Sequence, residues 1–125
     1  MILGAAVKVG LSAALPRGVQ DQIERGERLY AFYCASCHGR RGEGGDRVPA
    51  LIGPSRQYCR RFATALDLYR WVARQMPPED LLRPQEYWDI LAFLLDANGE
   101  LPRARVLNPE TAGRISLGIS CRKGP

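Results

Sequence analysis

The side chains best suited to chemistry lie within five consecutive residues, Cys34-Ala35-Ser36-Cys37-His38. Two thiols three positions apart, near the end of a helix, can reach both vinyl groups of one porphyrin. A histidine directly after the second thiol then lies under the ring, where it can bind iron. This C-x-x-C-H spacing is typical of covalent haem attachment, so it predicts that Cys34 and Cys37 bind one haem c and that His38 ligates its iron.

Two other kinds of site use the same residue types. A thioredoxin-like dithiol has the C-x-x-C spacing, but it is expected beside a βαβ unit, and no strand pattern is visible here. A zinc site would need two more ligands, and Cys59 and Cys121 are spaced too widely for a zinc finger. Because spacing does not determine pairing, Cys59 and Cys121 form a disulfide or remain two separate thiols.

The second axial ligand of the iron is predicted by elimination. His38 is the single histidine, and the two methionines are Met1 and Met76. Pro77 and Pro78 make the turn after Met76 rigid, which would hold its sulfur against the iron. The alternative is a methionine that fills a gap in the core. With His38 and Met76 both bound, a filled iron favours electron transfer over oxygen or peroxide chemistry. A haem enzyme or gas sensor with an open iron site would require Met76 to be off the iron.

The elements that position these residues are predicted to be helices. Apolar residues recur at helical spacing over residues 19–33, 64–74 and 84–97, and the last helix ends at Asn98-Gly99. Four glycines and a proline make residues 39–49 a loop. We therefore expect an all-α fold of three to four helices with long loops wrapped around one covalent haem. A large cofactor gives such long loops a surface to pack against.

The composition is that of a globular protein, and the charge is concentrated near the C-terminus. The 125 residues are 46% hydrophobic and carry a formal net charge of +5. Beyond Glu100 there are five cationic residues against one anionic residue, Glu110. No basic patch interleaved with aromatic residues is present, so no nucleic-acid partner is expected. The apolar residues 1–16 are too short to span a membrane, so no transmembrane segment is expected.

Several residues outside the motif occur at the offsets of a known family. Gly26 and Tyr30 lie eight and four residues before Cys34, and Phe93 lies in the last predicted helix. With these residues, the stretch from Gly26 to Gly99 resembles the class I cytochrome c family. In that family the glycine and the aromatic residues allow the first helix to cross the last one closely.

The resemblance also implies further haem contacts. Pro49-Ala50-Leu51 is similar to the family's P-x-L segment, in which the proline carbonyl accepts a hydrogen bond from the histidine ligand's other ring nitrogen. Leu51 would pack on the haem face, and Trp71 would hydrogen-bond a haem propionate or fill the core. The implied organisation is a cytochrome c domain over 19–100. Residues 1–18 precede it as a signal remnant or helix, and a basic, irregular tail follows over 101–125.

A narrower similarity concerns the redox partner. The runs PALIG from Pro49, WVARQMPPEDLLRPQEYWDILAFLLDANGE from Trp71 and LNPET from Leu107 are similar to cytochromes that accept electrons from periplasmic molybdenum sulfite or sulfane dehydrogenases. This implies an exported bacterial electron carrier, or the haem subunit of a dehydrogenase, in sulfur oxidation. The expected partner is a redox protein, and the chain itself is not expected to be an enzyme. A structural domain without any cofactor is the remaining alternative.

Overall fold

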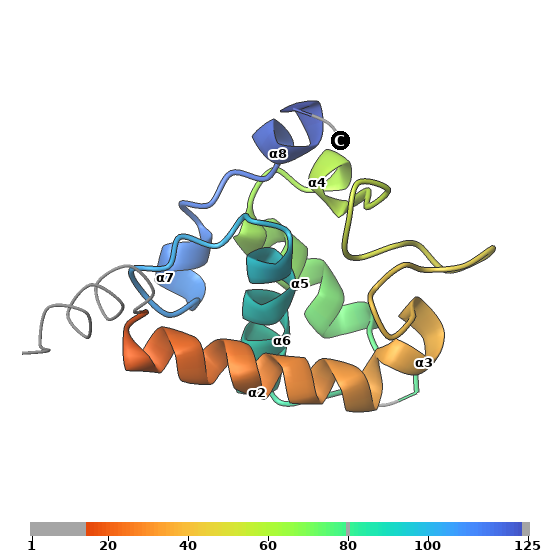
Figure 1. The fold of residues 1–125 in the computed structure, drawn as a ribbon, viewed down its shortest axis with the longest axis horizontal. Coiled ribbons are helices and arrows are strands. Elements are labelled where there is room, and N and C mark those ends of the chain that lie inside the picture. Colours follow the sequence, from red (N-terminus) through yellow and green to blue (C-terminus); the bar gives the residue numbers. More distant parts are fainter. Residues whose placement is uncertain (1–14, 80, 124–125) are drawn as a thin grey trace, which may run out of the picture.

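A computed structural model describes residues 15–79 and 81–123, and the described chain is helical, as expected. Among these residues the β structure is limited to one isolated bridge, between Thr64 and Ser116. Residues 1–14, most of the predicted N-terminal segment, lie outside the described residues. Figure 1 shows the helices, which are α2 (Arg17–Tyr33), α3 (Ala35–His38), α4 (Tyr58–Arg61), α5 (Ala65–Gln75), α6 (Pro84–Ala97), α7 (Pro109–Ala112) and α8 (Gly118–Lys123).

Local sequence signals explain where the long helices begin and end. The Thr64 hydroxyl accepts a hydrogen bond from the amide of Asp67 at 3.2 Å, which caps the start of α5. At the start of α6, the Glu86 carboxylate accepts a hydrogen bond from the amide of Arg83 at 2.8 Å. Gly99, with a φ of +72°, allows the chain to turn away after α6. All three long helices therefore lie within two residues of the predicted ranges.

Helices α2 and α6 cross in close contact (Figure 1). A Cβ atom added at Gly26 would lie 1.8 Å from the carbonyl oxygen of Asp89, so the two backbones meet where only glycine fits. Beside this point the rings of Tyr30 and Phe93 lie 5.6 Å apart. The structure therefore shows the close crossing that the sequence resemblance implied.

A buried carboxylate lies at the same crossing. Asp89 is 3% exposed and accepts hydrogen bonds from Arg25 at 2.9 Å and from Gln85 at 2.9 Å. Gln22 also contacts this carboxylate, and its amide group exchanges two hydrogen bonds with the backbone of Leu107, at 2.7 and 3.0 Å. These partners compensate the cost of burying polar groups. The two hydrogen bonds between Gln22 and Leu107 also attach the C-terminal segment to α2.

The C-terminal segment differs from the irregular surface tail that we expected. It contains α7 and α8, because Pro109 is tolerated in a first helical turn and the Asn108 side chain accepts a hydrogen bond from the Thr111 amide at 2.9 Å. A disulfide between Cys59 and Cys121 joins α4 to α8. The segment also contributes buried side chains to the main core, namely Leu101, Leu107, Ala112, Ile115 and Leu117.

Alanine at position 26 is expected to lower the free energy of unfolding of the haem-loaded protein by about 3 kcal/mol, because α2 and α6 would have to move apart. Equilibrium denaturation by guanidinium, followed by circular dichroism, measures this loss. Gly45→Ala is the matched control, since a Cβ atom there meets nothing within 4 Å. Equal stability of the two variants would contradict the close crossing.

Candidate haem-binding site

The C-x-x-C-H segment forms a single helical turn directly after α2. The amide of His38 donates to the carbonyl of Cys34 at 2.9 Å, and the amide of Gly39 donates to that of Ala35 at 2.8 Å. Cys34 is partly buried and Cys37 is exposed, and both are free thiols. Burial, together with the neighbouring Cys37, raises the pKa of the Cys34 thiol to about 11. The two thiols are separated by one helical turn, and the free Cys34 thiol is protonated at neutral pH.

A tyrosine from α2 holds the end of this turn. The Tyr30 hydroxyl donates a hydrogen bond to the carbonyl of Gly39 at 2.7 Å. Burial is the main cause that raises the pKa of Tyr30 to about 12, and the nearby Glu43 carboxylate adds to the effect. The phenol therefore remains a donor at physiological pH. The residue that packs at the helix crossing thus also fixes the position of the motif.

His38 has one ring nitrogen engaged by the protein. Its Nδ1 atom lies 2.9 Å from the carbonyl oxygen of Pro49. Because a carbonyl oxygen can only accept, Nδ1 carries a proton, and in the neutral ring Nε2 then keeps its lone pair for a metal. The intervening loop is held by a bond of 2.7 Å from the Gly44 amide to the His38 carbonyl. The structure thus brings together His38 and Pro49 as the resemblance implied.

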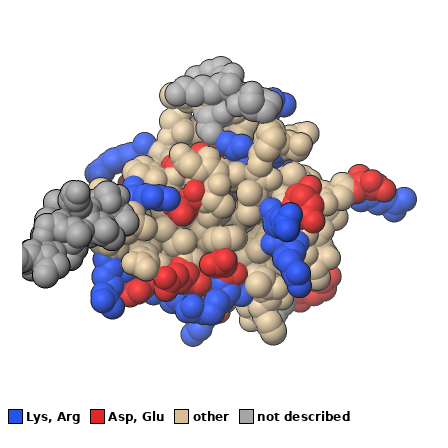
Figure 2. Space-filling model, in the orientation of Figure 1, with Lys and Arg blue, Asp and Glu red and all other residues tan. Residues whose placement is uncertain are grey.

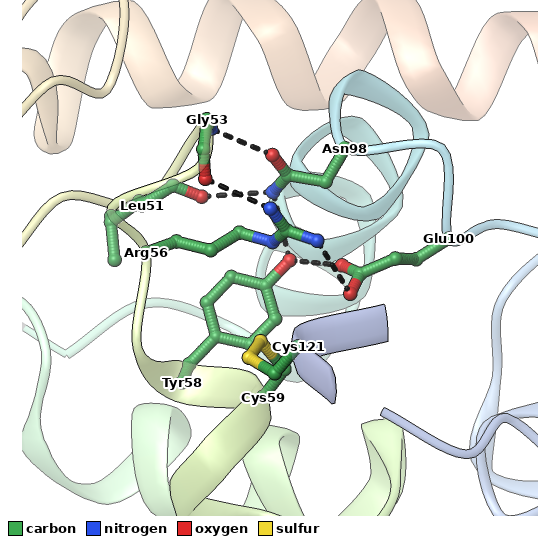
Figure 3. Close-up of a disulfide and its surroundings, with 8 residues drawn as sticks. All are labelled: Leu51, Gly53, Arg56, Tyr58, Cys59, Asn98, Glu100 and Cys121. Atoms are coloured by element: carbon green, nitrogen blue, oxygen red, sulfur yellow. Dashed lines mark hydrogen bonds and ion pairs between the residues drawn. A yellow bond between two sulfur atoms is a disulfide. The ribbon is translucent and has the colours of Figure 1, made fainter. Parts of the chain in front are cut away.

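The loop after Pro49 is attached to the end of α6 through Asn98 (Figure 3). The Asn98 side-chain amide donates to the Leu51 carbonyl at 2.9 Å, and its oxygen accepts from the Gly53 amide at 2.9 Å. Asn98 Nδ2 also lies 2.8 Å from the Tyr58 hydroxyl. Leu51, the predicted haem-face residue, is partly buried against the core. Its position therefore depends on the last residues of α6.

A buried ion pair completes this network. Arg56 and Glu100 lie 3.2 Å apart, with side chains 12% and 4% exposed. The Tyr58 hydroxyl donates a hydrogen bond to Glu100, and Tyr58 directly precedes the disulfide residue Cys59 (Figure 3). Burial, together with the charge of Glu100, raises the pKa of Tyr58 far above its ordinary value, which keeps the phenol neutral. Sequence reasoning did not predict this network of Arg56, Tyr58, Asn98 and Glu100, although Asn98 was recognised as part of a helix end.

Met76 follows α5 directly and is partly buried. Its amide donates to the carbonyl of Val72 at 2.9 Å, and its carbonyl accepts from the Tyr87 hydroxyl at 2.5 Å. The Met76–Pro77 peptide bond is cis. Both backbone polar groups of the predicted ligand are therefore bound by neighbouring helices. That Met76 binds iron remains a prediction.

Trp71 lies on α5 and is partly buried. Its ring centroid is 6.0 Å from that of Phe62, and the Arg61 guanidinium lies 5.1 Å from it. Trp71 therefore packs against Phe62 and Arg61, and its role as a core-filling residue stays a prediction. A hydrogen bond from its indole to a haem propionate remains a prediction.

The donor set fits a haem better than the alternatives. Because Cys59 and Cys121 form a disulfide, they do not complete a zinc site with Cys34 and Cys37. Across residues 15–79 and 81–123, no group of three or more His, Cys, Asp or Glu side chains could hold a metal ion. Two neighbouring free thiols and one imidazole with a free Nε2 atom are instead what covalent haem attachment requires. The helical surroundings also differ from the βαβ setting of a thioredoxin-like dithiol.

Comparisons with known proteins agree with this assignment. One solved structure, the crystal structure of the sulfane dehydrogenase SoxCD from Paracoccus pantotrophus, is similar at 30% identity with a TM-score of 0.62. The match covers 78% of this chain and 54% of that chain, so this chain spans about half of its length. No curated protein matches. Residues 21–94 match the family model described as cytochrome c oxidase, cbb3-type, subunit III. Since this match covers more than half of the sequence, the chain belongs to this family of cytochrome c domains, which implies covalently bound haem c.

Proposed function

We propose that this cytochrome c domain is a one-electron carrier with a single haem, bound covalently through Cys34 and Cys37. His38 and Met76 are the axial ligands. When bound, the haem supplies one-electron oxidation and reduction. The observation that carries the proposal is the contact of 2.9 Å between His38 Nδ1 and the Pro49 carbonyl, which leaves Nε2 as the metal-binding atom.

Each residue has a distinct task in this proposal. The two thioether bonds retain the cofactor and restrict its orientation. Pro49 holds the His38 ring in one tautomer and increases the electron-donating strength of Nε2. Met76 would hold the iron together with His38, which would leave no open position for oxygen or peroxide. With one histidine in the sequence, no second imidazole is present for acid–base chemistry.

The cellular role that we propose is electron transfer with a sulfur-compound dehydrogenase in the bacterial periplasm. The similarity to part of a sulfane dehydrogenase structure supports a dehydrogenase as the redox partner. The disulfide supports an oxidising compartment, where such bonds persist. Within the described residues, no helix has the length and apolar character to cross a bilayer. Acidic and basic side chains are interspersed on the face in Figure 2, and Arg40, Arg41 and Arg47 are exposed beside the haem-binding segment.

Met76→Ala is expected to remove the absorption band of methionine-bound iron from the oxidised protein. The reduced variant should bind carbon monoxide rapidly, because one axial position is open, whereas the wild type should bind it slowly. Optical spectra and stopped-flow mixing measure both effects, and the intact mass should still include one haem. Leu81→Ala is the matched control, since Leu81 lies in the same inter-helix segment and is 64% exposed. A wild type that binds carbon monoxide as fast as Met76→Ala would favour a gas sensor or enzyme.

A further inference from the structure

Tyr87 links two points of the segment that carries Met76. It lies in the first turns of α6 and is 3% exposed. Its hydroxyl donates to the Met76 carbonyl at 2.5 Å and accepts from the Leu82 amide at 3.0 Å. One phenol therefore joins the beginning and the end of the connection between α5 and α6.

The ring of Tyr87 is itself held by neighbouring aromatic residues. Tyr69, on α5, contacts it edge to face, with centroids 6.5 Å apart and an interplanar angle of 85°. Tyr69 in turn stacks on Trp88, with centroids 3.7 Å apart. Because the ring is buried among α5 and α6, its hydroxyl cannot follow the segment if the segment moves away.

The Met76 backbone is held on both sides. Its amide is bound by the carbonyl of Val72 on α5, at 2.9 Å, and its carbonyl is bound by Tyr87 on α6. The methionine side chain has three rotatable bonds, so it does not fix the place of its own sulfur. The position of the sulfur consequently depends on how firmly the backbone is held.

We propose that Tyr87 is a positioning residue that keeps the Met76 sulfur in place as the second axial ligand. This inference rests on the proposed ligation by Met76. Removing the hydroxyl leaves the Met76 carbonyl and the Leu82 amide without this partner, so the segment opens more often. Each opening would move the Met76 sulfur away from its binding position and would let an external ligand bind in its place.

Tyr87→Phe in the haem-loaded protein tests the proposal, because it keeps the ring and removes only the hydroxyl. Carbon monoxide should bind the reduced variant about tenfold faster than the wild type, as expected for the loss of two hydrogen bonds. The band of methionine-bound iron should weaken in the oxidised variant. The intact mass should be that of the haem-loaded protein, since Cys34 and Cys37 are unchanged.

Tyr69→Phe is the matched control, because it makes the same change on the ring that contacts Tyr87. Within residues 15–79 and 81–123, no hydrogen bond joins the Tyr69 hydroxyl to another group. This variant should keep the wild-type band and binding rate. Equal effects of the two substitutions, or no effect of Tyr87→Phe, would overturn the positioning role.

A second variant tests the other hydrogen bond. Leu82→Pro removes the amide that donates to Tyr87, and Leu82→Ala is its reference because the Leu82 side chain packs against the core. Relative to Leu82→Ala, Leu82→Pro should raise the binding rate by about threefold. If Tyr87→Phe does not accumulate, an unchanged rate of carbon monoxide binding in Leu82→Pro would overturn the proposal. A wild type without the methionine–iron band would overturn the proposed ligation and the role of Tyr87 together. An intact wild-type band with unchanged variants would overturn the role of Tyr87 alone.

Discussion

Replacement of both Cys34 and Cys37 by alanine is expected to abolish covalent haem completely. Both thioether bonds need these sulfur atoms, and the described cysteines outside the motif are joined to each other in a disulfide. Intact-mass measurement of protein made in a host that attaches haem c should show the polypeptide alone. The turn that carries His38 would lose its bond to the iron, and Leu51 would lose the haem face on which we expect it to pack, so the stability of the protein should also fall.

Two comparisons make this result specific. Cys37→Ala alone should retain haem through the remaining Cys34 thioether, at lower yield. The variant with Cys59→Ala and Cys121→Ala should still carry one covalently bound haem, as its intact mass would show. An intact mass that includes haem in the variant with Cys34→Ala and Cys37→Ala would contradict the proposed attachment.

Removal of the disulfide by alanine at positions 59 and 121 is expected to lower the free energy of unfolding by about 4 kcal/mol. The bond joins residues separated by 62 positions, so its loss releases a long closed loop in the unfolded chain. It also ties α8 to α4, beside the ion pair of Arg56 and Glu100 (Figure 3). Equilibrium denaturation of the haem-loaded protein measures the difference.

The single variants at positions 59 and 121 serve as controls. Each already lacks the disulfide, so each should lose nearly as much stability as the double variant. A thiol reductant should destabilise the wild type and leave the double variant unchanged, because thioether bonds to haem are not reduced. A loss below about 1 kcal/mol in the double variant would argue against a stabilising disulfide.

Features that depend on neighbours in the sequence were predicted from the sequence alone. The C-x-x-C-H motif indicated the cofactor chemistry because its three side chains act within one helical turn. Asn98-Gly99 marked the end of the last helix because turns are local interactions. The all-α class followed from helical periodicity and is confirmed by the structure. The close crossing at Gly26 came from the family resemblance, since no local pattern indicates which helix lies opposite a glycine.

Features that join distant parts of the chain became visible only in the tertiary structure. The pairing of Cys59 with Cys121 stayed open because spacing does not bring two thiols together. The C-terminal segment was expected on the surface, yet the Leu107 side chain is buried in the core and its backbone is bound by the Gln22 side chain. The contact between the Tyr87 hydroxyl and the Met76 carbonyl was not predicted, because it forms only where α5 and α6 pack together. The sequence by itself therefore determined the chemistry of the motif and the helices. Packing decided which distant groups support the motif, because such contacts form only when separate helices meet.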